Sequence, residues 1–340
     1  MAEIWARDIR YSLLRIYVDW CTRRSYTGIK VEGKYPKDGR AVIIAPNHSS
    51  ALMDALVVLQ SDKDPSVYGT RADVFNNPVI AKIFRVLKMV PIARRKEGLR
   101  AVAQNLEVMP EILDVLHHNV PFCIFPEGFS RSMHSLQPLH KGVARIALRN
   151  AATQPTCIVP VGIDYSEYFR YRGSCAMKIG EPIDVNEWIS EHPGLHESAS
   201  ATKLSQHLSE RIKELILYIP DDENYEQRLL ELRPPKKRRW WEWPLAVLTA
   251  PFFLLSAFLT LPQWAASRWV CRHKITDRGF HNSVRFFFRF AGAPVMIIIW
   301  AVLGFVFLPP LAACGLLLYY CLSYSIFYDW LNLVKINYQD

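Results

Sequence analysis

The sequence predicts an α/β fold: a mixed, mostly parallel sheet flanked by helices, followed by C-terminal transmembrane helices. Short apolar runs typical of buried strands, such as 41–45 and 157–163, alternate with longer runs typical of helices, which is the pattern of an α/β domain. Residues 243–267 and 290–328 contain no charged side chain. Because about 20 apolar residues cross a bilayer, the C-terminal part of the chain from residue 243 is expected to enter a membrane.

The chain is basic and free of any obvious metal or disulfide framework. It has 340 residues, room for one or two domains, and a formal net charge of +9, which favours nucleic acid, acidic membrane surfaces or phosphorylated substrates as partners. Its seven cysteines are scattered and form no C-x-x-C pair, consistent with a reducing compartment. The N-terminus lacks the apolar core of a signal peptide, so the soluble part is expected on the cytoplasmic side.

Residues 1–27 are expected to form an N-terminal amphipathic segment. Within 4–20, apolar side chains recur every three or four positions, and charged side chains interrupt them. This run is too charged to span a bilayer and has Trp5 and Trp20 at its ends, so we predict a helix that lies at a membrane interface. A helix that simply packs on the domain is the alternative.

A strand, a turn and a helix are predicted in succession between residues 40 and 59. The uncharged run 41–45 reads as a buried strand, and the apolar run 51–59 reads as a helix. His48 and Asp54 lie at the turn between them, which is where α/β folds carry their chemistry. They are candidates for a general base and the group that orients it, although one histidine and one aspartate at this spacing also arise by chance.

The other elements follow the same alternation. A second strand ending in a turn is predicted at 120–128, before Arg131. Further strands are expected at 29–32, 66–70, 157–163 and 176–183, and further helices at 79–88, 98–119 (kinked or divided at Pro110), 141–153 and 202–218. Together these elements predict a folded domain over residues 28–219.

Two segments in these turns resemble signature blocks of the glycerophospholipid acyltransferase family. NHSSALMD at 47–54 and FPEGFSRS at 125–132 are similar to the two main blocks of PlsC-like enzymes, which acylate glycerol 3-phosphate and lysophosphatidic acid. The weaker blocks follow in the right order, as GTRADVFNNP (69–78), VPIARR (90–95) and IVPVGI (158–163). The resemblance covers roughly residues 35–185 and implies a glycerol-3-phosphate acyltransferase-like fold.

The sequence departs from the family pattern at two points. Five residues separate His48 from Asp54 where the family usually has four, as in the yeast-type glycerol-phosphate and dihydroxyacetone-phosphate branch. The extra residue requires a local bulge or turn if the two side chains are to meet. FPEGFSRS in place of FPEGTRS moves the arginine one position on, to Arg131.

The resemblance implies transfer of a fatty acyl group from acyl-CoA or acyl carrier protein to glycerol 3-phosphate or lysophosphatidic acid, with His48 as base and Asp54 as its orienter. It implies no cofactor beyond the acyl donor and no metal. The neighbouring Ser49 and Ser50 leave a covalent role open. The residues it assigns to substrate binding are Arg71, Arg94, Glu127, Gly128 and Arg131; of these, Glu127 is expected to contact an acceptor hydroxyl or an arginine.

Three alternatives stay open at this point. The chain resembles enzymes that also act on other lysophospholipids. A non-enzymatic membrane protein that binds lipid through this domain would have the same blocks. A metal-dependent hydrolase would use His48, Asp54 and Glu127 as ligands, although no further His, Asp or Glu cluster lies near these blocks.

Residues 220–242 are predicted to be a polar and basic linker, and 243–330 a transmembrane or re-entrant helical region. The basic run 236–239 is followed at once by tryptophans, which is typical of a cytoplasmic membrane interface rather than a nucleic-acid site. Basic residues flank the first apolar run on both sides, so either it dips in and returns, with a hairpin at Pro309-Pro310 in the second run, or the chain crosses three times. We expect an integral membrane protein with a cytoplasmic catalytic domain, anchored by a tail that supplies no catalytic group.

Overall fold

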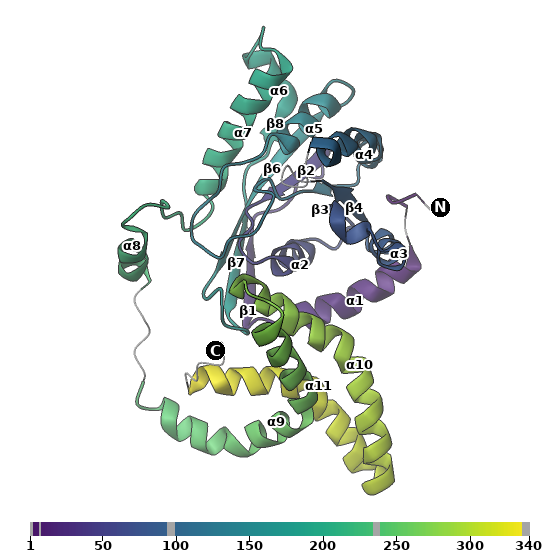
Figure 1. Cartoon of the computed structure of the whole chain (residues 1–340), viewed down its shortest axis with the longest axis vertical. Helices are drawn as coiled ribbons and strands as arrows, with labels where there is room; N and C mark the ends of the chain where they lie inside the picture. Colours follow the sequence, from purple (N-terminus) through teal and green to yellow (C-terminus); the bar gives the residue numbers. More distant parts are fainter. Residues whose placement is uncertain (1–2, 7, 94–98, 234–238, 335–340) are drawn as a thin grey trace.

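The computed structural model describes residues 3–6, 8–93, 99–233 and 239–334. Its centre is an eight-stranded sheet with the strand order β1-β7-β6-β2-β5-β3-β4, and β8 pairs with β6 beside β7 (Figure 1). The strands are β1 (Gly28–Glu32), β2 (Ala41–Pro46), β3 (Val67–Arg71), β4 (Met89–Ile92), β5 (Phe122–Cys123), β6 (Thr156–Tyr165), β7 (Ser174–Ile179) and β8 (Ile183–Asp184). Only the pairs β6–β7 and β6–β8 are antiparallel, so the predicted mixed, mostly parallel sheet is confirmed.

Helices cover both faces of this sheet. The helices that precede the tail are α1 (Ile9–Arg24), α2 (Leu52–Ser61), η1 (Ala72–Phe75), α3 (Pro78–Val86), α4 (Leu99–His117), α5 (Gly142–Ala151), α6 (Val185–Glu191), α7 (Glu197–Lys213) and α8 (Tyr225–Leu232), of which α8 stands apart from the sheet. The tail follows as α9 (Glu242–His273), η3 (Arg278–Phe280), α10 (His281–Phe307) and α11 (Pro310–Leu333).

The central strand β2 divides the core by its alternation. All six of its residues are buried, as expected for a parallel strand with helices on both faces. Ala41, Ile43 and Ala45 join a cluster with α4, α5 and α7, whereas Val42 and Ile44 join a second cluster with α1 and α2. The second cluster also includes Phe286, Tyr324, Phe327, Tyr328 and Leu331 from the tail. The tail is therefore part of the core of the folded chain, which an anchoring role alone would not require.

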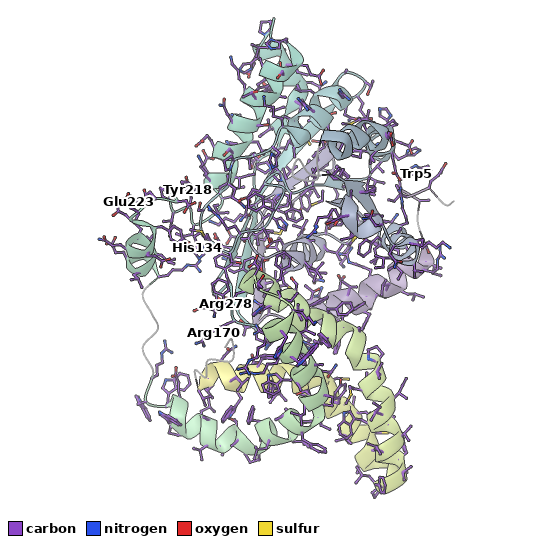
Figure 2. All side chains as sticks on the ribbon, viewed as in Figure 1. Trp5, His134, Arg170, Tyr218, Glu223 and Arg278 are labelled. Carbon is purple, nitrogen blue, oxygen red and sulfur yellow. The ribbon has the colours of Figure 1, made fainter. Side chains whose placement is uncertain are left out.

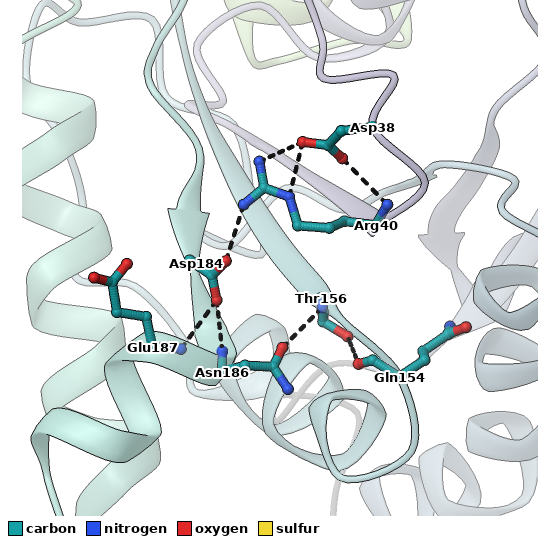
Figure 3. Close-up of polar contacts among 7 residues, drawn as sticks. All are labelled: Asp38, Arg40, Gln154, Thr156, Asp184, Asn186 and Glu187. Atoms are coloured by element: carbon teal, nitrogen blue, oxygen red, sulfur yellow. Dashed lines mark hydrogen bonds and ion pairs between the residues drawn. The ribbon is translucent and has the colours of Figure 1, made fainter.

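The amino ends of the central strands are fixed by a polar cluster (Figure 3). The guanidinium of Arg40 donates to Asp38 (2.7 Å) and to Asp184 (3.1 Å), joining the start of β2 to β8. Asp184 also caps α6, because its carboxylate accepts hydrogen bonds from the N–H groups of Asn186 and Glu187. These contacts lie at the amino ends of the strands, opposite to the carboxyl ends where the chain turns after β2 and β5.

Several element boundaries differ from the predictions. The first helix begins at Ile9, after the N-cap Asp8, so Trp5 lies before it; Trp5 instead donates to Asp114 (2.8 Å) and stacks on His118. The predicted strand 176–183 is two strands, and the helix predicted from 202 begins at Glu197. α4 continues through Pro110, which is exposed, so the helix is not divided there.

The tail gathers at one end of the molecule, at the bottom of Figure 1. Three of its helices are long and apolar enough to cross a membrane, judged by length and composition. α9 is one continuous helix through Pro251 and Pro262, so the helix is not broken at either of the prolines where a dip and return was predicted. The second run is a pair of helices that meet at Pro309-Pro310, as predicted.

Candidate active site

The site begins at the carboxyl ends of three neighbouring strands. β2 runs parallel to both β5 and β6, so the turns after β2 and β5 and the loop after β6 lie at one edge of the sheet. Asn47, the first residue after β2, is buried and fixed to β6 by a reciprocal pair of bonds. Its side chain accepts from the N–H of Ile163 (2.6 Å) and donates to the Ile163 carbonyl (3.0 Å). Asn47 thereby sets the position from which His48 projects.

The structure brings His48 and Asp54 together. The distance between His48 Nδ1 and Asp54 Oδ2 is 2.8 Å. The Asp54 side chain is fully buried, and that of His48 keeps 18% of its surface exposed. Because a carboxylate only accepts hydrogen bonds, the Nδ1 nitrogen carries the proton and Nε2 is left as the acceptor. The imidazole is therefore in the tautomer that a general base needs.

Asp54 is held by three further donors. The N–H groups of Ser49 and Ser50 donate to Oδ2 at 2.8 and 2.7 Å, and the hydroxyl of Tyr165 donates to Oδ1 at 2.6 Å. Each carboxylate oxygen therefore has a fixed partner, which compensates for its removal from water. Tyr165 is the last residue of β6 and lies just beyond the last family block, IVPVGI, so the sequence blocks do not include it.

The extra residue between His48 and Asp54 is accommodated at Ala51. This residue precedes the first turn of α2 and has φ 48° and ψ −125°, a conformation that side-chain-bearing residues rarely adopt. The backbone reverses there, so that the N–H groups of Ser49 and Ser50 point back at the Asp54 carboxylate. The local turn that this spacing requires is thus centred on Ala51.

Glu127 joins the turn after β5 to the turn after β2. Its side chain is buried, Oε1 accepts from the N–H of His48 at 2.5 Å, and Oε2 accepts from the N–H of Gln137 at 2.9 Å. Burial raises the pKa of Glu127 to about 7, while these two N–H groups act in the opposite direction. The sequence predicts an acceptor hydroxyl or an arginine as its partner, whereas both oxygens bind backbone groups.

The rest of FPEGFSRS packs against the same histidine. The ring of Phe125 stacks on His48 with centroids 4.3 Å apart, and the N–H of Arg131 donates to the His48 carbonyl at 3.1 Å. Ser132 Oγ donates to the Ser49 carbonyl at 3.0 Å. Gly128 has φ +73°, and a Cβ there would come within 2.7 Å of the His140 ring. This glycine is therefore required by the turn itself, apart from any ligand.

The predicted phosphate-binding arginines are placed differently from one another. The guanidinium of Arg131 donates to Asp221 at 2.6 Å and keeps 35% of its surface exposed. Arg71 lies at the carboxyl end of β3 and pairs with Asp73 at 2.5 Å. Arg94 lies outside the described residues. Asp221 follows all the family blocks, so nothing in the motif pattern pointed to it.

A second buried histidine lies close to this site. His134 Nδ1 is 3.2 Å from the hydroxyl of Tyr168 and 3.5 Å from Asp164 Oδ1, and the His134 N–H donates to the hydroxyl of Tyr225 of α8. His134 is labelled in Figure 2. This histidine carried no motif signal in the sequence. Throughout the ranges that the structure describes, no three His, Cys, Asp or Glu side chains are grouped to hold a metal ion. The set His48, Asp54 and Glu127 is therefore not arranged as metal ligands.

Comparison with known proteins identifies similar sequences. Residues 28–164 match the family model described as acyltransferase. The glycerol-3-phosphate O-acyltransferase 2 of Saccharomyces cerevisiae is 38% identical over 85 residues, which cover 24% of this chain and 11% of that protein. The glycerol-3-phosphate O-acyltransferase 1 of the same yeast is 31% identical over 100 residues, which cover 28% and 13%.

The aligned parts are thus small fractions of both yeast proteins. An uncharacterized acyltransferase of Schizosaccharomyces pombe is 26% identical over 99 residues, which cover 14% of its length. Among solved structures, the 1-acyl-sn-glycerophosphate acyltransferase PlsC of Thermotoga maritima aligns over 68% of this chain and 86% of that chain, with 21% identity and a TM-score of 0.45.

Proposed function

We propose that this chain is a glycerophospholipid acyltransferase, because its residues 28–164 match the acyltransferase family model and its yeast relatives are named glycerol-3-phosphate O-acyltransferases. It transfers a fatty acyl group from an acyl thioester, acyl-CoA or acyl carrier protein, to a hydroxyl of glycerol 3-phosphate or lysophosphatidic acid. The observation that carries this proposal is the 2.8 Å contact between His48 Nδ1 and the buried Asp54, at the turn after a central parallel strand. The reaction takes place at a membrane that holds the tail, with the catalytic residues on the cytoplasmic side and no cofactor beyond the acyl donor.

The chemistry follows from the tautomer of His48 that the contact with Asp54 favours. A glycerol hydroxyl is a poor nucleophile near neutral pH, so His48 Nε2 takes its proton as the oxygen attacks the thioester carbonyl. The imidazolium that forms is stabilised by Asp54. When the carbon–sulfur bond breaks, the leaving thiolate takes the proton from His48, and the products are an ester and a free thiol. The substrate hydroxyl replaces an enzyme nucleophile, so Ser49 and Ser50 need not become acylated.

The backbone around His48 limits where the oxyanion is stabilised. The N–H of His48 donates to Glu127, and those of Ser49 and Ser50 donate to Asp54. These three donors are already bound to carboxylates and are not oriented toward a substrate carbonyl. The negative charge of the tetrahedral intermediate must therefore be stabilised by other donors.

Glycerol 3-phosphate is the acceptor to test first. The two yeast relatives are named glycerol-3-phosphate acyltransferases, and the five-residue spacing between His48 and Asp54 resembles that branch. Arg131 and Arg71 would bind its phosphate only by sharing or displacing Asp221 and Asp73. A phosphate that exchanges with a carboxylate in this way gives a reversible site without leaving an arginine unpaired.

The test is an acyl-transfer assay on the purified full chain in nanodiscs. Labelled acyl-CoA and labelled acylated acyl carrier protein are each offered as donors. The acceptors are glycerol 3-phosphate, lysophosphatidic acid, other lysophospholipids and a neutral monoacylglycerol. The His48→Ala variant gives the background rate. We expect transfer to glycerol 3-phosphate well above that background. Absence of transfer to every acceptor, in a protein that binds the same lipids, would favour the non-enzymatic lipid-binding alternative. Transfer confined to another lysophospholipid would correct the acceptor.

A further inference from the structure

The loop after β6 connects the catalytic pair to the tail. Tyr165, which donates to Asp54 Oδ1, is the last residue of β6, and its ring packs near those of Tyr26 (centroids 6.0 Å apart) and Tyr168 (5.8 Å). Its hydroxyl reaches Asp54 only while this ring keeps its place. The loop 166–173 that follows therefore bears directly on the position of the Asp54 carboxylate.

The first turns of α10 hold the backbone of this loop. The amide of Asn282 donates to the Tyr168 carbonyl at 2.8 Å and to the Arg170 carbonyl at 3.4 Å. Arg285 donates to the Phe169 carbonyl at 3.3 Å and to Asn282 Oδ1 at 2.9 Å. Asn282 and Arg285 are both buried, so three successive carbonyls of the loop receive their donors from one helix. Because an unpaired buried carbonyl is costly, loss of these donors would allow the loop to move.

Two further observations bring the tail to the same place. A small cavity is lined by residues of both parts, among them Ser50, Tyr165, Arg170 and Asn282. Just before α10, Gly279 packs so closely on the turn after β5 that a Cβ would lie 2.7 Å from Ser132 Oγ, which itself donates to Ser49. The Arg278 guanidinium lies over the Phe169 ring at 5.2 Å, and Figure 2 labels Arg278 and Arg170 at this junction.

We propose that Asn282 is a positioning residue for the His48–Asp54 pair, so that the start of α10 belongs to the active-site scaffold. Asn282 fixes the Tyr168 and Arg170 carbonyls, the loop fixes the Tyr165 ring, and Tyr165 fixes Asp54. The kinetic consequence rests on the proposed function, whereas the structural consequence does not. Since the apolar, membrane-spanning part of α10 follows directly after Arg289, the geometry of the catalytic pair depends on how the tail packs on the sheet.

Three variants of the full chain test this proposal. Asn282→Ala removes the loop's donor, Tyr165→Phe removes the hydroxyl on Asp54, and the double variant combines the two changes. Gln263→Ala is the matched control: Gln263 is a buried amide of α9 that bonds to the Phe288 carbonyl and the Tyr320 hydroxyl, both within the tail. Gln263→Ala therefore loosens the tail without touching the loop.

The first readout is residue-level hydrogen exchange, which needs no activity. The N–H groups of Ser49 and Ser50 have Asp54 as their acceptor, so we expect them to exchange roughly tenfold faster in Asn282→Ala and Tyr165→Phe, and unchanged in Gln263→Ala. Faster exchange in the loop 166–173 but not at Ser49 and Ser50 would reduce Asn282 to a loop contact and overturn the proposal. Should Asn282→Ala fail to fold, Asn282→Asp keeps the size and the Arg285 contact, and replaces the N–H donor by a negatively charged carboxylate oxygen.

The second readout is steady-state kinetics. We expect Asn282→Ala to lower kcat roughly tenfold while KM for both substrates stays unchanged, because a misplaced base acts on the transition state alone. The double variant should be no slower than Tyr165→Phe, since both changes act through one contact; full multiplication of the two losses would contradict this. If the wild-type protein transfers no acyl group while the variants show the expected change in hydrogen exchange, the proposed function is refuted and the scaffold role of Asn282 is retained.

Discussion

The turn after β2 and the turn after β5 each bury one carboxylate beside His48, and the two carboxylates have different partners. Asp54 accepts four hydrogen bonds, one of them from the imidazole. Glu127 accepts two, both from backbone N–H groups, and burial raises its pKa to about 7. Burial alone therefore does not define the role of a carboxylate. The donors around Asp54 suit the orienter of a base, which is its proposed role, and those around Glu127 make it a link between two turns.

The largest expected effect is the loss of activity on substitution of His48 or of its carboxylate partner Asp54. His48→Ala should abolish turnover and keep the fold, because the lost group acts in the transition state. Asp54→Asn should lower kcat by roughly 10³- to 10⁴-fold, since the imidazole would lose its orienting anion. Initial rates with labelled acyl-CoA measure both, thermal unfolding checks the fold, and His207→Ala on the exposed side of α7 is the control. Loss of a general base should leave at most a few per cent of the wild-type rate. A His48→Ala protein that keeps more than this would refute the assignment of His48 as the base.

Glu127→Ala should act mainly on stability. It leaves the buried N–H groups of His48 and Gln137 without acceptors, at about 1–3 kcal/mol for each. Glu127→Gln keeps one acceptor oxygen and should lose roughly half as much. Denaturant unfolding measures the two losses, and activity should fall in the same order because the His48 backbone shifts. A rise in KM for the acceptor without any loss of stability would instead identify Glu127 as a substrate contact.

The raised pKa of Glu127 predicts a pH dependence of stability with a definite sign. Its pKa is about 7 in the folded chain against an ordinary value of 4.5, so the folded state favours the protonated form. The stabilisation is fully present below pH 4.5 and is lost as the pH rises through about 7, by about 3 kcal/mol at most. The difference in unfolding free energy between wild type and Glu127→Gln should therefore change over this window. A constant difference would show that the two N–H donors cancel the effect of burial.

The ion pair between Arg131 and Asp221 predicts a smaller effect on substrate affinity. If the acceptor phosphate displaces Asp221, Arg131→Ala should raise KM for glycerol 3-phosphate roughly ten- to a hundredfold and spare KM for the acyl donor. Arg131→Lys should recover only part, because an ammonium lacks the planar fork. Asp221→Asn should lower KM for the same acceptor, since the competing anion is gone. Equal losses on phosphorylated and neutral acceptors would make Arg131 a structural residue.

The sequence predicts those parts of the molecule that depend on neighbouring residues. The apolar run 41–45 is β2, and the charge-free runs lie within α9, α10 and α11, because local periodicity and composition determine such elements. His48 and Asp54 are six positions apart and meet across one turn.

The contacts that complete the site are not local. Tyr165 is 111 positions from Asp54, and the bond between Glu127 and the His48 N–H joins residues 79 positions apart. Both contacts exist because β6, β2 and β5 are neighbours in the sheet, an order that no periodicity encodes. In the tail, Phe286 and Tyr324 are as apolar as side chains that would face lipid, so composition could not show that they join the core.

The smallest expected effects compare the backbones of the two turns. The turn after β5 reverses at Gly128, whereas the turn after β2 reverses at Ala51, and both residues have positive φ. Gly128→Ala should destabilise the chain by about 1–3 kcal/mol, through strain and through the clash with His140. Gly39→Ala is the matched control, because Gly39 has φ +87° with nothing within 4 Å of a Cβ, and it should cost only the strain.

Ala51→Gly tests whether the backbone conformation at Ala51 is strained. Replacing a buried alanine by glycine ordinarily costs about 1 kcal/mol or more, through the lost methyl group and the greater freedom of the unfolded chain. At Ala51 the relief of a strained conformation should offset this loss, so we expect an unfolding free energy within about 0.5 kcal/mol of wild type. Ala147→Gly, at a buried position of α5, should show the ordinary cost. Equal losses at Ala51 and Ala147 in denaturant unfolding would mean that the spacing of His48 and Asp54 is accommodated without strain at Ala51.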